Sequence, residues 1–201
     1  MKARNCASIL LAAGASTRLG SPKQLLRLNG ESLLQRTARL AAEAGCSPNL
    51  IVLGAHSEIL KPGIDGGNFT LLENPGWQEG MGSSIRVAMK RVLMAPKVPG
   101  SVLLLVCDQP DLTVDLLRAL LDLHDARPEA IVASQYGGAL GVPAVFGAHY
   151  FSELAMLSGE SGARRVISRH VEHAQQVEFA GGDFDIDLPE DAARLRQIDI
   201  E

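Results

Sequence analysis

Apolar residues in this chain gather in short unbroken runs, separated by longer stretches in which apolar positions recur every three or four residues. A short apolar run bounded by turn residues is typical of a strand buried on both faces. We expect strands at residues 7–11, 49–54, 69–72, 101–106, 130–134 and 142–146, with shorter extended pieces at 176–179 and 184–187. The run at 101–106 is the most strand-like of these.

The longer stretches have helical spacing. Helices are predicted at 31–44, 83–94, from the capping residue Thr113 onward, at 150–173 with a break at 158–159, and from about Pro189, while 61–68 is expected to be a loop. Strands that alternate with helices of this length indicate βαβ units. We therefore expect an α/β fold: a three-layer, mostly parallel, Rossmann-like sheet with helices on both faces, formed by residues 1–201 as a single domain.

The composition and charge of the chain argue against some kinds of binding partner. The chain has 201 residues, 46% apolar and 21% charged, with a formal charge of −4, so nothing attracts it generally to nucleic acid or to an anionic membrane. Its three cysteines are widely spaced and include no C-x-x-C pair, which argues against a disulfide framework or a zinc site. With no signal-peptide core and no run of about 20 apolar residues, a cytoplasmic location is expected.

The clearest chemical signal follows the first strand, where the chain reads L-A-A-G-A-S-T-R-L-G-S-P-K-Q over residues 11–24. Gly14 and Gly20 permit a tight turn whose backbone N–H groups can surround an anion, and Arg18 and Lys23 add two positive charges. Neither the P-loop pattern nor G-x-G-x-x-G is present. The loop predicts a polyphosphate site; a simple surface Gly–Ser loop is the alternative.

Acidic residues at two distant places are candidates for holding a cation. Asp108 is the first acid after the run at 101–106, so we expect it at the carboxyl edge of the sheet. The loops after Leu11 and Leu72 are expected to leave the sheet at the same edge. Asp185 and Asp187 share one face of an extended segment. A Mg²⁺ ion bound to polyphosphate takes only one or two protein carboxylates. The structural alternatives are a turn aspartate before Pro110 and a cap on the last helix.

A third feature is N-P-G-W-Q-E-G-M-G-S-S-I-R at residues 74–86. Its Gly-Ser-Ser portion opens a predicted helix, where exposed N–H groups and the helix dipole favour a phosphate or a base carbonyl. Ser83 is expected to be the N-cap.

Together these motifs resemble the molybdenum cofactor cytidylyltransferases, a branch of the MobA-like NTP transferase superfamily. The matching strings are the loop at 11–24, the segment 74–86, C-D-Q-P at 107–110, D-I-D-L-P-E-D at 185–191, and shorter stretches at 141–146 and 159–164. Leu188 departs from the usual threonine of the closing motif. The resemblance implies Arg18, Lys23 and Asp108 as catalytic residues and Asp108 with Asp187 as metal ligands, Asp187 being chosen over Asp185. It implies nucleotide contacts from Leu11, Ala12, Ala13, Gly14, Ser16, Arg18, Lys23, Gly80, Gly82, Ser83, Ser84 and Asp108, and contacts to a second substrate from Gln109, Pro143 and Arg164.

The reaction implied is Mg²⁺-dependent transfer of CMP from CTP to molybdopterin with release of pyrophosphate, Mn²⁺ being the alternative ion. The product would serve a client enzyme of the xanthine dehydrogenase type. Guanylyl relatives usually read L-A-G-G where this chain has Ala13, which favours a pyrimidine. The alternatives are cytidylyl or guanylyl transfer to another phosphorylated small molecule, such as methylerythritol phosphate, and a non-catalytic pterin-carrying chaperone.

Overall fold

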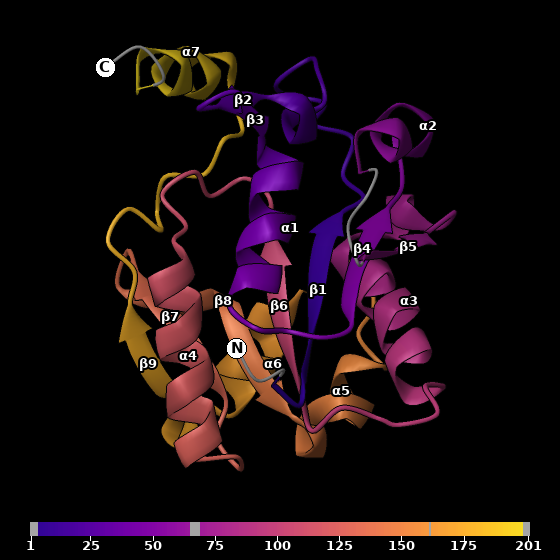
Figure 1. Ribbon diagram of the computed structural model, residues 1–201, viewed down its shortest axis with the longest axis vertical. Helices are drawn as coiled ribbons and strands as arrows, with labels where there is room; N and C mark the ends of the chain where they lie inside the picture. Colours follow the sequence, from indigo (N-terminus) through magenta and orange to yellow (C-terminus); the bar gives the residue numbers. More distant parts are fainter. Residues whose placement is uncertain (1–3, 65–68, 161, 199–201) are drawn as a thin grey trace.

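The computed structural model describes residues 4–64, 69–160 and 162–198 of the chain (Figure 1). Its strands are β1 (Cys6–Ala12), β2 (Arg27–Leu28), β3 (Glu31–Ser32), β4 (Asn49–Leu53), β5 (Phe69–Glu73), β6 (Ser101–Val106), β7 (Val132–Tyr136), β8 (Ala139–Gly147) and β9 (Gln175–Glu178). Its α-helices are α1 (Leu33–Glu43), α2 (Ser57–Leu60), α3 (Met81–Leu93), α4 (Val114–Ala126), α5 (Phe151–Leu154), α6 (Ala163–Arg169) and α7 (Pro189–Ile198).

Within those residues, seven strands form one sheet in the order β5-β4-β1-β6-β8-β7-β9. The pairs β1–β4, β1–β6, β4–β5 and β7–β9 are parallel, while β8 runs antiparallel to both of its neighbours. The mostly parallel sheet confirms the predicted α/β class. Because β1, β4, β5 and β6 point the same way, the loops after them leave from one edge.

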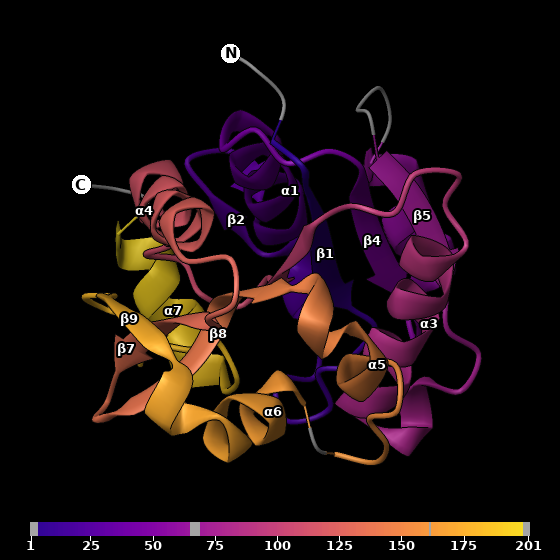
Figure 2. The ribbon, with the colours of Figure 1, turned by 90° about the horizontal axis from the view of Figure 1, so that it is seen from below.

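Helices cover both faces of the sheet, as Figure 2 shows from below. Side chains alternate along β1: Leu10 packs with the core beneath α1 and α4, whereas Ile9 packs with the core beneath α3, α5 and α6. This alternation follows from the two-residue period of a strand. Burial on both faces explains why the strand runs are continuously apolar.

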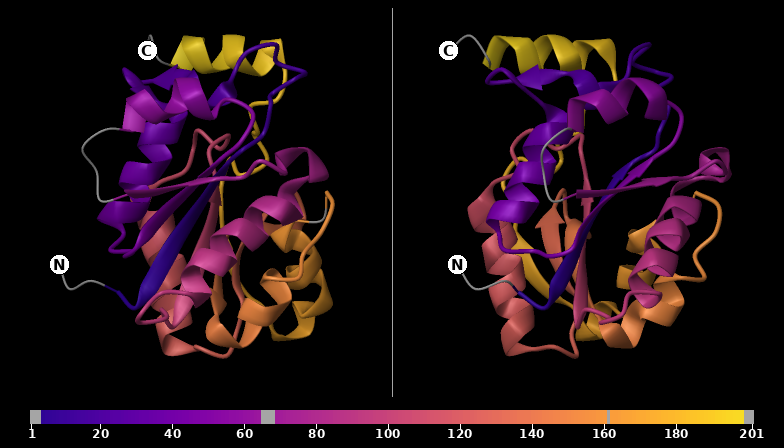
Figure 3. Two further views of the ribbon diagram at one scale, coloured as in Figure 1. Left: turned by 90° about the vertical axis from the view of Figure 1, so that its right-hand side faces the viewer. Right: turned by 45° about the vertical axis from the view of Figure 1, so that its right-hand side comes forward.

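A small cap lies over the carboxyl edge of the sheet (Figure 3). It consists of the β2–β3 hairpin and α7, which enclose a cluster of Leu28, Leu33, Ile186 and Leu195. The hairpin was not predicted, although its turn residues Asn29 and Gly30, both at positive φ, form the Asn-Gly pair that favours a two-residue β-turn.

Several local predictions need correction. Residues 61–64 form a 3₁₀ helix rather than a loop, and residues 65–68 of the predicted loop lie outside the described residues. The helical stretch expected at 150–173 is shorter than predicted: it holds α5, α6 and a 3₁₀ helix at Val171–His173. The predicted break lies between α5 and α6, where Gly159 has a positive φ. Residues 184–187 pair with no strand of the sheet in the described structure. No helix among the described residues is long and apolar enough to cross a bilayer.

Candidate active site

The loop after β1 forms a tight turn built around Ser16. The Ser16 carbonyl accepts hydrogen bonds from the N–H groups of Leu19 and Gly20, and its Oγ accepts one from the N–H of Lys23 at 3.2 Å. Ser16 and Gly20 both have positive φ. In the described part of the chain, the N–H groups of Ser16, Thr17 and Arg18 donate to no protein acceptor. The turn therefore offers a set of donors of the kind that binds anions.

Two side chains hold this loop in place from behind. The buried amide of Gln24 donates from Nε2 to the carbonyls of Ala12 and Gly14, both at 3.0 Å. The Nε2 of His56 lies 2.9 Å from the carbonyl of Ala15. These contacts engage the carbonyls of Ala12, Gly14 and Ala15, whereas the N–H groups of Ser16, Thr17 and Arg18 stay available to a ligand.

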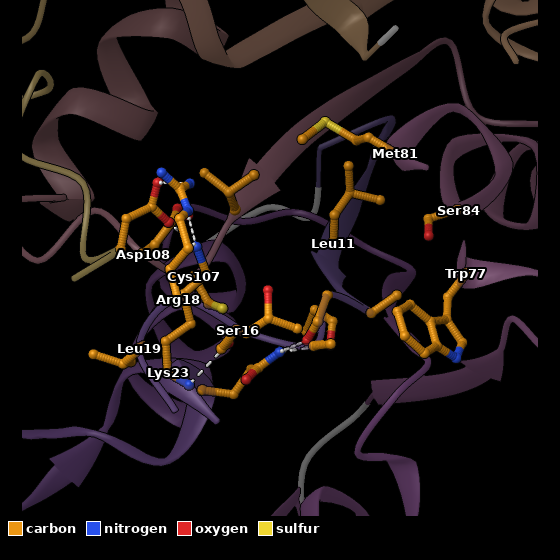
Figure 4. Close-up of a pocket in the computed structure, with 18 of the residues that line it drawn as sticks. Leu11, Ser16, Arg18, Leu19, Lys23, Trp77, Met81, Ser84, Cys107 and Asp108 are labelled. Atoms are coloured by element: carbon orange, nitrogen blue, oxygen red, sulfur yellow. Dashed lines mark hydrogen bonds and ion pairs between the residues drawn. The ribbon is translucent and has the colours of Figure 1, made fainter. Parts of the chain in front are cut away.

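The charged end of the site brings together residues from three parts of the chain (Figure 4). The Lys23 ammonium Nζ lies 2.5 Å from Oδ2 of Asp108 and 3.0 Å from Oδ1 of Asp187. Arg18 Nη2 lies 2.7 Å from the other oxygen of Asp187. The N–H of Ile186 donates to the carbonyl of Asp108 at 3.0 Å, which attaches the C-terminal segment to the end of β6. Two acids 79 positions apart (187 minus 108) thus converge on one cation.

This arrangement keeps the central groups ionised. Burial alone would lower the pKa of Lys23, but the charge and hydrogen bond of Asp108, aided by Asp187, raise it above its ordinary value. Burial would raise the pKa of Asp187, but the hydrogen bonds and charges of Lys23 and Arg18 lower it. Partial desolvation, followed by the negative charge of Asp108, raises the pKa of the neighbouring Asp185 to about 6.

A pocket of about 460 Å³ extends from these charges along the carboxyl edge of β1. Its lining comes from the loop after β1, the segment 77–84, the end of β6, the segment 186–187 and Glu160. Figure 4 shows Arg18, Lys23 and Asp108 at one end and Trp77 and Ser84 at the other, with Leu11 between them. The volume is that of an ordinary small-molecule site.

Comparison with known proteins agrees with this geometry. Residues 8–175 match the MobA-like NTP transferase domain. The chain belongs to the MobA-like NTP transferase family.

Relatives within this family carry different names. Nicotine blue oxidoreductase of Paenarthrobacter nicotinovorans is 33% identical over 78% of this chain and 78% of its own length. The molybdenum cofactor cytidylyltransferase of Escherichia coli K12 is 25% identical over the full length of both chains. The crystal structure of Rv0371c from Mycobacterium tuberculosis H37Rv is 28% identical with a TM-score of 0.81, covering 98% of this chain and 100% of that one. A structure of Rv0371c in complex with manganese gives 27% identity, a TM-score of 0.77 and the same coverage.

Most of the residues predicted to contact the nucleotide line the pocket of this MobA-like domain. They are Leu11, Ala12, Ala13, Gly14, Ser16, Arg18, Lys23, Gly80, Ser84 and Asp108, and the predicted metal ligand Asp187 joins them. Asp187 is not the side-chain cap of α7, because its oxygens bind Lys23 and Arg18. Asp191 instead accepts the N–H groups of Asp187 and Leu188, at 3.0 and 2.7 Å.

Gly82 and Ser83 are placed differently from the prediction. Helix α3 begins at Met81 with Gly80 as its N-cap, so Ser83 is not the cap. The Ser83 Oγ donates to the carbonyls of Gly76 and Gly80, and the N–H of Gly82 donates to the carbonyl of Gly159 at 3.0 Å. Neither residue lines the pocket. The N–H groups of Gly82 and Ser83 and the Ser83 hydroxyl therefore already bond within the protein.

The three residues predicted for the second substrate lie outside this pocket. Gln109 is buried and donates from Nε2 to the carbonyls of Val142 and Gly182, at 3.2 and 3.3 Å. The Pro143 carbonyl accepts a hydrogen bond from Ser134. Arg164 lines a separate hollow of about 360 Å³ beside β7 and β9. Gln109 and Pro143 thus make hydrogen bonds within the protein, although the buried Oε1 of Gln109 has no partner in the described structure. Arg164 lines a cavity.

Several pocket residues were not among the predicted contacts, and the four with the most prominent side chains are Trp77, Met81, Glu160 and the supporting Gln24. Trp77, Met81 and Gln24 each belong to one of the motifs described above. The motifs drew attention to these positions, but no contact with a ligand was predicted for them. Glu160 reaches the pocket only because the segment 157–160 packs on the start of α3. Glu160 also belongs to a matching stretch, residues 159–164, but nothing in that stretch shows that it packs on α3.

The carboxylates suit a divalent cation. Oδ1 of Asp108 is buried and has no hydrogen-bond partner in the described structure, so an oxygen is left for a ligand to satisfy. The described residues hold no cluster of three or more metal-binding side chains, and Mg²⁺ bound to phosphate needs only one or two carboxylates. Asp108 and Asp187 would supply them.

Proposed function

We propose that this MobA-like protein transfers CMP from CTP to molybdopterin or the molybdenum cofactor and releases pyrophosphate. The observation that carries the proposal is the convergence of Asp108 and Asp187 on the Lys23 ammonium, at 2.5 and 3.0 Å, beside a turn with unused N–H donors. A triphosphate needs this combination of backbone donors, cations and metal-binding acids.

In this reaction the protein mainly has to align the acceptor phosphate with the α-phosphorus of the triphosphate and stabilise the negative charge. A terminal phosphate of the acceptor is already an anion at neutral pH, so it attacks the α-phosphorus without a protein base while pyrophosphate leaves. Lys23 would stabilise the charge that develops on the α-phosphate, and Arg18 with the loop N–H groups would hold the β- and γ-phosphates. A divalent cation, Mg²⁺ or Mn²⁺, would neutralise phosphate oxygens when held by Asp108 and Asp187.

The cytidine preference is supported by Ala13, which lines the pocket where a larger purine would need space. Ala13 packs closely against its surroundings, since a Cβ added at Gly54 would lie 2.8 Å from the Ala13 methyl group and 2.8 Å from the Trp77 Cβ. The family also includes guanylyltransferases, for example a 32% identical probable molybdenum cofactor guanylyltransferase of Synechococcus elongatus that aligns over 62% of this chain. The base is therefore the first thing to test.

The oxidoreductase name of one relative points to a different reaction class. The described pocket favours transfer, because two acids and two cations at one end suit a metal-bound polyphosphate and a redox cofactor does not require them. A pterin-carrying chaperone would likewise have no need of both acids.

The test is a panel of CTP, GTP, ATP and UTP, each with Mg²⁺ or Mn²⁺ and with or without molybdopterin, read by pyrophosphate release. We expect release with CTP only when molybdopterin is present. Release with GTP alone among the triphosphates would replace the cytidylyl assignment, and no release with any pair would reject the transferase.

Replacing the metal ligand tests the same site directly. We expect Asp108→Asn to lower metal-dependent pyrophosphate release at least about 100-fold at a temperature where circular dichroism shows the variant to be folded. Its thermal unfolding midpoint should also fall, because Lys23 loses the partner of an enclosed ion pair. Asp115→Asn is the matched control, because Asp115 is an exposed acid on the following helix α4. Near-normal activity of Asp108→Asn would show that the acid is only structural.

A further inference from the structure

Two segments that are far apart in sequence meet at one wall of the pocket. The N–H of Gly82 donates to the carbonyl of Gly159 at 3.0 Å. A Cβ at Gly80 would lie 2.5 Å from that carbonyl oxygen, and one at Gly82 would lie 2.8 Å from the nitrogen of Ser158. The backbone of 158–160 thus lies directly on the first turn of α3, and Figure 2 shows α5 beside that helix.

Arg86 ties the two segments together from outside the pocket. Its Nη1 and Nη2 donate to the two carboxylate oxygens of Glu79, at 2.7 and 2.6 Å. Nη1 also donates to the carbonyl of Leu157 at 2.7 Å, and Glu79 accepts the N–H of Gly159 at 3.4 Å. We call this set, Arg86, Glu79 and the backbone of 157–159, the α3 clasp. A bidentate arginine–carboxylate pair has a defined geometry that a lysine cannot reproduce.

The clasp does not reach the charged end of the site. Its neighbours Trp77, Gly80 and Glu160 line the pocket, while Arg86 and Glu79 themselves do not. Figure 4 places Trp77 at the end opposite to Lys23 and Asp108. The proposed transfer chemistry therefore gives no reason for the clasp, whereas the shape of the pocket wall does.

We propose that Arg86 is a positioning residue for nucleotide binding: through Glu79 and the Leu157 carbonyl it holds Glu160 and the start of α3 together as one wall of the pocket. The ligand is the nucleoside triphosphate of the proposed function, on which this inference rests. Because the clasp lies away from Lys23 and Asp108, its loss weakens nucleotide binding and leaves the chemical step largely intact.

The experiment compares Arg86→Ala, Arg86→Lys, Glu79→Gln, Glu79→Ala and the double alanine variant with the wild type. Arg91→Ala is the matched control, because Arg91 is an exposed arginine on the same helix. One readout is the KM for CTP and kcat from pyrophosphate release. The second is the Kd for Mg-CTP from the fluorescence of Trp77, which is the chain's single tryptophan and lines the pocket.

We expect Arg86→Ala to raise both KM and Kd about tenfold with kcat changed less than about twofold. Arg86→Lys should recover only part of the loss, and the double variant should be no worse than Arg86→Ala, since both substitutions break one unit. An unchanged Kd in Arg86→Ala, an equal loss in Arg91→Ala, or a fall in kcat at constant KM would each overturn the inference.

Two further outcomes separate this inference from the proposed function. If the wild type binds Mg-CTP without turnover, the transferase proposal fails while Kd still decides the role of Arg86. If Arg86→Ala does not fold, Glu79→Gln gives the answer, because it keeps the side-chain size and removes the charge. A wild-type Kd in Glu79→Gln and Arg86→Lys would then overturn the clasp.

Discussion

At the scale of single residues, the site is a balance of two cations and two acids held at contact distance. Lys23 and Asp108 are both mostly enclosed, each with a side chain 17% exposed. Each charge has lost most of its hydration, and the ion pair between them compensates for that loss. Asp185 is the exception. It stands near these charges, has a raised pKa and forms no ion pair in the described structure.

The raised pKa of Asp185 has a consequence for stability. Its pKa is about 6 in the folded protein and near 3.8 ordinarily, so folding opposes its ionisation. The cost is small near pH 4, where the acid is protonated in the folded state and about half ionised in the unfolded state, and it approaches its full value above about pH 6. The charges that act on it are those of Asp108, Lys23, Asp187 and Arg164.

We expect Asp185→Asn to be more stable than the wild type at pH 8, by about 1 kcal/mol or less once solvent screening is allowed for, and nearly equal to it near pH 4. Urea unfolding at both pH values, with EDTA present, measures this difference. The exposed Asp183→Asn is the control and should show no such pH dependence. A variant that is less stable at pH 8 would mean that the Asp185 carboxylate is stabilised by a partner.

At the scale of elements, the start of α3 is determined by what packs on it. The Gly-Ser-Ser portion at residues 82–84 is predicted to favour a phosphate or a base carbonyl, yet Gly82 makes room for the backbone of Ser158. An absent side chain indicates a close neighbour without telling which one. Only the path of the chain between α5 and α6 decides that the neighbour is protein.

Substitution of Gly82 tests this packing. We expect Gly82→Ala to lower the free energy of unfolding by about 1–3 kcal/mol, because its methyl group would lie within 3 Å of the backbone of Ser158. Gly14→Ala is the comparison: a Cβ there meets nothing within 4 Å, so a change within about 0.5 kcal/mol is expected. Urea denaturation gives both values. Wild-type stability in Gly82→Ala would show that the segment at 158 yields without cost.

At the scale of the whole molecule, the C-terminal segment completes a site that the N-terminal strand begins. Ile186 is fully buried between the cap and the sheet, packed in the cluster with Leu28, Leu33 and Leu195. Its burial aims the flanking Asp187 at Lys23. The cap thus explains how Asp187, near the C-terminal end of the chain, contacts Lys23 in the loop after β1.

We expect Ile186→Ala to lower the free energy of unfolding by about 2–5 kcal/mol and, under conditions where it stays folded, to reduce metal-dependent pyrophosphate release because Asp187 is less firmly held. Leu188→Ala, at a side chain 42% exposed, should stay within about 0.5 kcal/mol of the wild type. The measurements are urea unfolding and the pyrophosphate assay. Full activity with normal stability in Ile186→Ala would contradict this role of the cap.

Local patterns in the sequence predicted most strands of the sheet. The apolar runs at β1, β4, β5 and β6, the cap of α4 at Thr113 and the mostly parallel class follow from periodicity and turn residues, because these act over a few positions. The antiparallel direction of β8 was not predicted. The crevice also follows, since parallel strands end at one edge. The motifs marked Lys23, Asp108 and Asp187 before any contact between them was known.

What only the tertiary structure decided is which distant groups touch. Distant side chains meet in the Lys23–Asp108–Asp187 cluster, and in the α3 clasp the Arg86 side chain meets the backbone carbonyl of Leu157, 71 positions away. Nothing within a short stretch of sequence encodes either contact. Gly82, Ser83 and Gln109 were predicted to contact ligands, and in the structure they form hydrogen bonds within the protein. These bonds also join segments whose contact the sequence does not show. A polar or glycine-rich motif indicates that its groups form close contacts or hydrogen bonds. The packing of the whole chain determines whether those contacts are made to a ligand or to the protein itself.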